Sequence, residues 1–185
     1  MANSLHYTVP GMNPEDGATV AATLQKRLYA LNDLHLTLKH VHWNVVGPQF
    51  IAVHEMLDPQ VEAVRAMADA VAERIATLGA SPNGTPGALV RDRTWDDYSV
   101  NRAGSIAHLG ALDVVYTGVI GDHRKAMEEV GELDPVTEDL LTGQSGELEL
   151  FHWFIRAHLE SAGGELSTDG ASSEAEAAKD AADAV

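Results

Sequence analysis

Four long segments with helical periodicity restrict the fold of this chain more than any other feature of its sequence. They span about residues 15–45, 50–78, 100–130 and 135–162, and apolar residues recur in each every three or four positions. This spacing places the apolar side chains on one face of a helix, which must be buried against other helices. The first segment shows it most clearly, in Val20, Leu24, Leu28, Leu31, Leu34, Leu38 and Val41.

Glycine and proline, which commonly end helices, separate these segments. Between the second and third segments, residues 79–94 form a Gly/Pro-rich loop. After this loop, Trp95–Tyr98 is predicted to open a short helix capped by Thr94. Pro59 lies inside the second segment, where proline usually kinks a helix. The breaks are at Gly47-Pro48, Gly79, Gly131 with Pro135, and Gly163-Gly164.

The expected fold is therefore all-α. It is a four-helix bundle with one long crossover between the second and third helices and a short helix in that crossover. Among bundles, this connectivity is the ferritin-like one. We expect a flexible N-terminal segment at 1–14 and the ferritin-like bundle at 15–166. Residues 167–185 are rich in Ala, Ser, Glu and Asp and lack a core pattern, so they are expected to form an acidic, disordered tail.

Composition narrows the class of protein further. The chain has 185 residues, no cysteine and a formal net charge of −16. The lack of cysteine excludes disulfides and thiolate metal sites and fits a reducing compartment. Neither a secretory signal nor an apolar run of ~18 residues is present, so we expect a cytoplasmic protein that does not cross a membrane. The negative charge disfavours attraction to nucleic acid or anionic lipid, and it suits solubility alone or a protein that gathers cations.

Two pairs of possible metal ligands lie in the second segment at helical spacing. His54 and Asp58 are four residues apart, as are Asp69 and Glu73, so each pair shares a helix face. The 11 residues from Asp58 to Asp69 span roughly 16 Å of helix, too far for both pairs to hold one ion within a chain. Both pairs nevertheless lie on one stripe, because 11 steps of about 100° return to within roughly 20° of the start.

The two pairs are also placed symmetrically. Residues 54 and 73 average 63.5, as do residues 58 and 69. A two-fold axis through this midpoint would set His54 of one chain opposite Glu73 of another, and Asp58 opposite Asp69. We hypothesise two identical metal sites shared across an antiparallel helix pair, with His42 reaching in from the preceding helix.

A set of two imidazoles and three carboxylates, without sulfur, suits iron or manganese, and zinc can also occupy it. Carboxylate oxygen favours Fe³⁺ over Fe²⁺, so a mixed site promotes oxidation of ferrous ion. The alternative is that Asp69 and Glu73 form a solvated helix face and that His54 is a capping or core histidine. Trp43, next to His42, is expected to pack, although a ring beside a redox site can also supply an electron.

A di-iron site buried within one bundle is the rival arrangement. Such sites take a Glu-x-x-His motif from each of two helices. The chain has one such motif, Glu149 to His152, and the second segment offers none. We therefore expect Glu149 and His152 to be surface residues.

The order of the candidate ligands resembles a family signature. The pattern H-W-N-(x)9-H-E-M-x-D-(x)10-D-x-x-x-E-R starts at His42 and resembles that of the Dps family, the miniferritins known as DNA-binding proteins from starved cells. The stretches NDLHLTLKHVHWNVVGP, RIATLG, DRTWDDYSV and FHWFIRAHLESAGG are similar to actinobacterial members in particular. The resemblance covers about residues 5–166.

This resemblance implies a hollow homododecamer with ferroxidase sites at two-fold interfaces. There, His42, His54 and Asp58 of one chain would face Asp69 and Glu73 of its partner, and Trp43 would lie beside them. Fe²⁺ would be oxidised by hydrogen peroxide, or by O₂, and stored as ferric mineral, which protects against oxidative damage. The resemblance also implies acidic pores at three-fold axes, although a charge run is more often a solvated face. The pore candidates are Asp122, Glu128, Glu129, Asp134, Glu138 and Asp139.

The chain departs from the family's name in the charge of its ends. DNA-binding members use a tail rich in lysine and arginine, which reaches phosphates from an acidic shell. Here the first basic residue is Lys26, and after Ser161 one lysine, Lys179, stands against six acids. A dodecamer would carry 12 × −16 = −192 formal charges. We therefore expect an iron-oxidising enzyme and store; the alternative is a DNA-binding, nucleoid-compacting stress protein.

Overall fold

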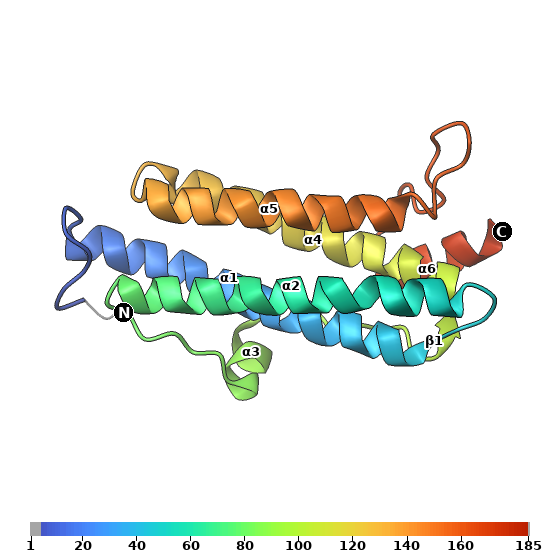
Figure 1. Cartoon of the computed structure of the whole chain (residues 1–185), viewed down its shortest axis with the longest axis horizontal. Coiled ribbons are helices and arrows are strands. Elements are labelled where there is room, and N and C mark those ends of the chain that lie inside the picture. The colour runs from blue at the N-terminus through green and yellow to red at the C-terminus, as the bar shows by residue number, and fades with distance from the viewer. Residues whose placement is uncertain (1–4, 185) are drawn as a thin grey trace.

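A computed structural model describes residues 5–184, and four long helices form most of it (Figure 1). These are α1 (Pro14–Asn44), α2 (Phe50–Thr77), α4 (Ser105–Gly131) and α5 (Pro135–Arg156). The shorter elements are α3 (Pro86–Asp92), α6 (Glu174–Asp183) and the strands β1 (Val45–Val46) and β2 (Ala103–Gly104). The predicted all-α four-helix bundle, with its long crossover between α2 and α4, is confirmed, and the strands add only a two-residue parallel ladder.

Polar caps and a glycine set where several helices begin and end. Asn13 accepts a hydrogen bond from the amide of Asp16 at 2.8 Å at the start of α1, and Asp134 accepts one from the amide of Val136 at 3.3 Å at the start of α5. Both helices have proline in the first turn, where a missing N–H costs little. Gly47, between α1 and α2, has a φ of 102°, which glycine adopts without strain. This short connection brings the end of α1 beside the start of α2.

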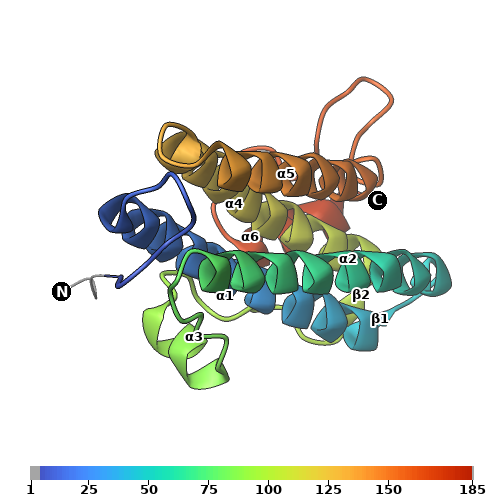
Figure 2. The same cartoon turned by 60° about the vertical axis from the view of Figure 1, so that its left-hand side comes forward.

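The long helices pack as two pairs. α1 lies against α2 and α4 against α5, and the pairs meet mainly along α1 and α4 (Figures 1 and 2). The core between them contains the whole predicted apolar stripe of α1. α2 is one continuous helix across Pro59, so the proline does not end the helix between the two ligand pairs. The largest fully buried side chains include Leu24, Leu31, Leu38, Leu57, Leu109, Leu112, Tyr116, Leu141 and Leu148.

The crossover between α2 and α4 contains a short helix, as predicted, but at a different place. The sequence predicts it at Trp95–Tyr98, whereas the structure has it at α3, and residues 95–99 are not helical. Pro86 fixes a helical φ in the first turn of α3. The indole of Trp95 instead donates a hydrogen bond to Asp33 of α1 at 2.7 Å. This contact holds the segment after α3 along α1.

The C-terminal segment corrects the prediction of a disordered tail at 167–185. Residues 174–183 form α6, which lies on α4 (Figure 1); Val185 lies outside the described residues. Ala177, Ala178 and Ala181 form its buried face. A Cβ on Gly110 of α4 would lie 2.4 Å from the carbonyl oxygen of Ala177, so glycine is what permits this close approach. A helix that packs alanine onto glycine has no stripe of large apolar residues, which is why its sequence lacks a core pattern.

The N-terminal segment, predicted to be flexible over 1–14, is irregular at residues 5–13, and residues 1–4 lie outside the described part of the chain. Val9 and Met12 pack against the core. The carbonyl of Tyr7 lies so close to Gly79 that an added Cβ would meet its oxygen at 2.3 Å. The segment therefore covers part of the bundle. Over residues 5–184, none of the helices combines the length and hydropathy that crossing a membrane requires.

Candidate functional site

The end of α1 and the first turns of α2 bring two histidines into contact. The rings of His42 and His54 stack with their centroids 3.6 Å apart and an interplanar angle of 23°. Nδ1 of each ring lies 2.9 Å from the backbone carbonyl oxygen of the other residue. Because a carbonyl oxygen only accepts, Nδ1 carries the proton in both rings, and each neutral ring keeps a lone pair on Nε2. The backbone thus fixes both rings in the same tautomer, one that can bind a metal ion through Nε2.

Asp58 lies one helical turn after His54. Its Oδ1 is 2.9 Å from Nζ of Lys39 and 3.3 Å from Nδ1 of His42. The hydrogen bond from Lys39 lowers the pKa of Asp58, so the carboxylate is ionised at neutral pH. It faces the Nδ1 edge of His42 and the ammonium, not Nε2. Sequence reasoning missed Lys39, because it lies 19 positions before Asp58, and this separation matches no spacing within a helix.

Asp69 and Glu73 lie on α2 apart from this cluster. Both are exposed, and roughly 16 Å of helix separates Asp69 from Asp58. Asp69 lines a groove of about 610 Å³ between α1 and α2, together with His35. Among the side chains of residues 5–184, no group of three or more His, Asp or Glu is arranged to hold a metal ion. One chain therefore presents the predicted ligand set as two separate parts.

Exposed apolar side chains lie near the histidine pair. Trp43, Phe50 and Ile51 are 71%, 38% and 56% exposed, and the ring centroid of Phe50 is 4.9 Å from that of His54. The packing expected of Trp43 is therefore not provided by its own chain. Large apolar side chains exposed together are typical of a surface that another molecule covers.

Asp134 has a different role from the predicted one in a pore. It is only 4% exposed, and its Oδ2 lies 2.6 Å from Nη2 of Arg74. Burial alone would raise the pKa of Asp134, but hydrogen bonds from Arg74 and Thr137 outweigh it and lower the pKa. The structure thus makes Asp134 the buried cap of α5, which corrects the prediction.

The other pore candidates are nearer the surface. Asp122 lies 3.6 Å from Nη2 of Arg27 and 3.1 Å from Nζ of Lys125. Glu129 accepts a hydrogen bond from the hydroxyl of Thr23 at 3.2 Å. The cations Arg27 and Lys125 therefore offset the charge of Asp122, whereas the neutral hydroxyl of Thr23 leaves the charge of Glu129 unchanged. The remaining candidates are at least partly exposed, and they are Glu128, Glu138 and Asp139.

His152 is not the surface residue that the sequence predicts. Its Nε2 lies 2.6 Å from Oδ1 of Asp113, whose Oδ2 accepts a hydrogen bond from Thr168 at 2.7 Å. Burial would raise the pKa of Asp113, but these two hydrogen bonds lower it. The network connects α5, α4 and the segment before α6. Glu149, as expected, is at the surface, where it pairs with Arg124 at 2.5 Å.

Comparison with known proteins agrees with this architecture. The ferritin-like domain family matches residues 21–162. The DNA protection during starvation protein of Mycolicibacterium smegmatis is 64% identical over 172 residues, which make up 93% of this chain and 94% of the relative. The structure of Mycobacterium smegmatis Dps in its tetragonal form is 65% identical, with a TM-score of 0.87, and the match covers 89% of this chain and 99% of that one.

A second solved structure gives the same result. DpsA14 from Streptomyces coelicolor is 67% identical, with a TM-score of 0.87, and the match covers 88% of this chain and 97% of that one. The similarity thus extends over nearly the full length of each relative. The chain belongs to the Dps family of ferritin-like proteins.

Proposed function

We propose that this protein is a ferroxidase and iron store. It oxidises Fe²⁺ with hydrogen peroxide, or with O₂, and keeps the ferric mineral inside a hollow homododecamer, which protects the cell against oxidative damage. The observation that carries the proposal is the reciprocal hydrogen bonding of His42 and His54. It directs both Nδ1 protons to backbone carbonyls and leaves two Nε2 lone pairs for a metal ion.

The donor set suits iron as a substrate. Imidazole nitrogen binds Fe²⁺, and the sequence supplies no cysteine that would favour a softer metal. Carboxylates are hard, anionic ligands and stabilise Fe³⁺ more than Fe²⁺. A site that combines both therefore binds ferrous ion and promotes its oxidation.

A second copy of the chain completes this site. Asp58 lies beside His42 in the same chain. Asp69 and Glu73 are exposed on α2, and a two-fold axis through position 63.5 would bring them to the histidine pair of a partner chain. An isologous contact repeats the site twice. The exposure of Trp43 and Phe50 near the histidine pair supports the same placement, because association would bury them.

The reaction balances with peroxide as the oxidant. Two ferrous ions give one electron each, the O–O bond of one hydrogen peroxide molecule breaks, and two protons are taken up to give two waters and two ferric ions. Consuming both reactants at one site suppresses hydroxyl-radical formation from free Fe²⁺ and peroxide. Among the predicted pore acids, those that are at least partly exposed remain candidates to guide Fe²⁺ inward, namely Asp122, Glu128, Glu129, Glu138 and Asp139.

Anaerobic loading with Fe²⁺ followed by addition of peroxide tests the proposal, with ferric absorbance as the readout. The double variant His42→Ala/His54→Ala should oxidise iron at least about tenfold more slowly than wild type, since even outer partners of metal ligands contribute that much. His158→Ala is a matched control, because His158 is exposed on the C-terminal side of α5. If the double variant is as fast as wild type, the site is elsewhere.

DNA compaction is the competing function, since one relative is named a DNA protection during starvation protein. We propose that this chain does not bind DNA substantially at neutral pH and physiological salt. Its net charge is −16, and α6, docked on α4, carries Lys179 among four acids. A gel shift with linear duplex at moderate salt should leave the DNA free. Retention of the DNA in the well would favour the competing function.

A further inference from the structure

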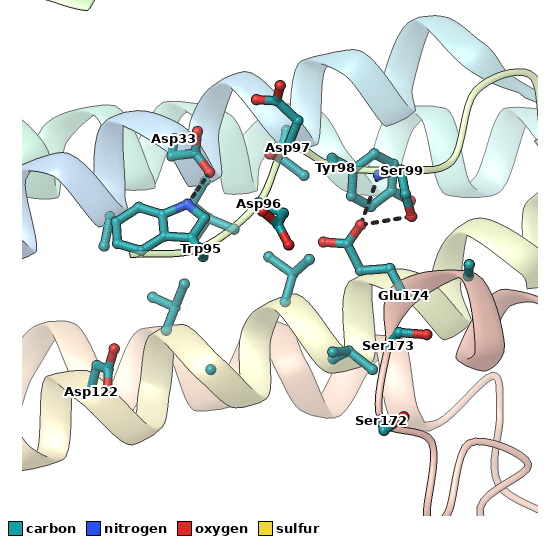
Figure 3. Close-up of a pocket in the computed structure, with 18 residues that line it drawn as sticks. Asp33, Trp95, Asp96, Asp97, Tyr98, Ser99, Asp122, Ser172, Ser173 and Glu174 are labelled. Carbon is teal, nitrogen blue, oxygen red and sulfur yellow. Dashed lines mark hydrogen bonds between the residues drawn. The ribbon is translucent and has the colours of Figure 1, made fainter. Parts of the chain in front are cut away.

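A cavity that shares no residue with the predicted ligand set lies between α1, residues 95–99, α4 and the start of α6 (Figure 3). Its volume is about 560 Å³, which is within the range of roughly 300–1,000 Å³ typical of small-molecule sites. α1 and α4 provide its apolar floor. The floor residues are Ala30, Leu34, Val114, Val115, Gly118 and Val119.

Every charged side chain that lines this cavity is acidic. Three of the five carboxylates, those of Asp33, Asp97 and Asp122, already pair with arginine or lysine outside the cavity. Asp96 and Glu174 form no ion pair within residues 5–184, and their carboxylates point toward one another in the cavity (Figure 3). The apolar floor is therefore bordered by two uncompensated negative charges.

Hydrogen bonds hold one of these carboxylates in place. Glu174 accepts from the amide of Ser99 at 2.8 Å and from its hydroxyl at 3.1 Å. Burial raises the pKa of Glu174, and Asp33 and Asp96 add to this effect by repulsion. The partial positive charge at the N-terminus of α6 is offset by Glu174 itself and by Glu176 in the same turn. A cation between Glu174 and Asp96 would remove the repulsion.

We propose that this cavity binds a small organic cation, namely a primary ammonium with an apolar body. The ammonium lies between Asp96 and Glu174, and the apolar body covers the floor formed by α1 and α4. An anion would be repelled by five acidic side chains. A neutral apolar molecule would leave the two carboxylates uncompensated. Across residues 5–184 no acidic cluster here is arranged to hold a metal ion, and a hydrated ion would not cover an apolar floor.

Two glycines of α4 provide a matched pair of variants. A Cβ on Gly118 meets nothing within 4 Å, so Gly118→Leu extends a side chain into the cavity without a clash at its base. Gly121 also has nothing within 4 Å but does not line the cavity. Both substitutions improve helix propensity, so neither is expected to unfold α4. A difference in ligand binding between them reports on the cavity itself.

Isothermal titration of hexylammonium into the assembled, full-length protein tests the proposal, with 1-hexanol and hexanoate as probes of the same length. Wild type and Gly121→Leu should bind hexylammonium saturably, and Gly118→Leu should not. Asp96→Asn should weaken binding about fivefold, the upper end for a partly exposed ion pair. Hexanol should bind more weakly than hexylammonium, and hexanoate should not bind.

Several results would overturn the proposal. These are the absence of saturable hexylammonium binding by wild type, unchanged binding by Gly118→Leu, and equal binding of hexanol and hexylammonium. Glu174→Gln is a second test of charge, but it could also loosen α6. Asp96→Asn keeps the test valid in that case, because the Asp96 carboxylate forms no hydrogen bond within residues 5–184. None of these binding measurements involves iron, so their result does not depend on whether the protein has the proposed ferroxidase activity.

Discussion

Replacing Gly110 by alanine should detach α6 from α4 while the four-helix bundle stays folded. The new Cβ would lie 2.4 Å from the carbonyl oxygen of Ala177 and 2.7 Å from the Cβ of Ala181. Neither contact atom belongs to a flexible side chain that could turn away. The two helices must therefore separate, and the separation removes the contact that makes the C-terminal segment helical.

The structure gives the magnitude of this effect. Docking buries the methyl groups of Ala177, Ala178 and Ala181, which together contribute about 2 kcal/mol. The two hydrogen bonds from Ser99 to Glu174 add roughly 1 kcal/mol each. Alanine within α4 is meanwhile more favourable than glycine by about 1 kcal/mol. We therefore expect local docking to be lost and the stability of the bundle itself to be unchanged or slightly higher.

Hydrogen exchange of the amides of residues 174–183 measures this directly. In wild type, an opening free energy of about 2–4 kcal/mol corresponds to protection of roughly 30- to 1,000-fold. Gly110→Ala should reduce this protection nearly to that of an unstructured chain. Gly118→Ala is the control, since its Cβ meets nothing within 4 Å, and it should leave exchange in α6 unchanged. Equal protection of α6 in Gly110→Ala and wild type would refute the packing argument.

Two further predictions concern buried or paired charges. Lys39→Met should tighten Zn²⁺ binding, measured by competition with a chelating dye, because the Lys39 ammonium and a divalent cation compete for Asp58; an affinity like that of Lys39→Arg would contradict this. Burial lowers the pKa of His123 to about 4 from 6.5, so the unfolded chain binds this proton more tightly. The free energy of unfolding should then fall as pH decreases from 6.5 to 4. In thermal denaturation, the melting temperature of His123→Gln should depend less on pH over this range than that of wild type.

The bundle was predictable because burial imposes a period on the sequence. One face of α1 is entirely buried, and the large apolar residues from Val20 to Val41 occupy that face. Their spacing in the sequence therefore predicts the buried face of the helix. The Gly47-Pro48 break was equally informative, since Gly47 has a positive φ that other residues avoid. Spacing along α2 placed His54 with Asp58 and Asp69 with Glu73, and the unbroken helix across Pro59 preserves that spacing.

Contacts between different helices leave no comparable periodic pattern in the sequence. His42 and His54 are 12 residues apart, and only the turn between α1 and α2 stacks their rings. The hydrogen bond of Lys39 with Asp58 and that of His152 with Asp113 likewise depend on how helices pack, not on local spacing. Sequence reasoning could name possible metal ligands, but it could not show which nitrogen of each histidine is free.

Residue type led to wrong predictions where the same type of residue is compatible with two structural roles. Asp134 at the start of α5 is an acid in an acidic region, but an aspartate before proline is also a helix cap, and Arg74 makes it a buried one. α6 was mispredicted for a related reason, because residue types typical of disorder form a packed helix there. Its small residues look like the composition of a disordered segment, whereas Gly110 makes alanine sufficient for close packing. A contact of this kind can be recognised only when the positions of both helices in the structure are known.

An incomplete ligand set in each chain has a consequence for assembly under the proposed function. Alone, the chain offers two imidazoles and a carboxylate engaged by Lys39, and within residues 5–184 these are not arranged as a group that holds a metal ion. Asp69 and Glu73 from a second chain would add two carboxylates that form no ion pair within residues 5–184 of their own chain. A ligand that binds the dimer more tightly stabilises it by the same free energy, so each tenfold gain in affinity on assembly contributes about 1.4 kcal/mol to association. The exposed Trp43 and Phe50 would drive association without metal, and iron would strengthen it further.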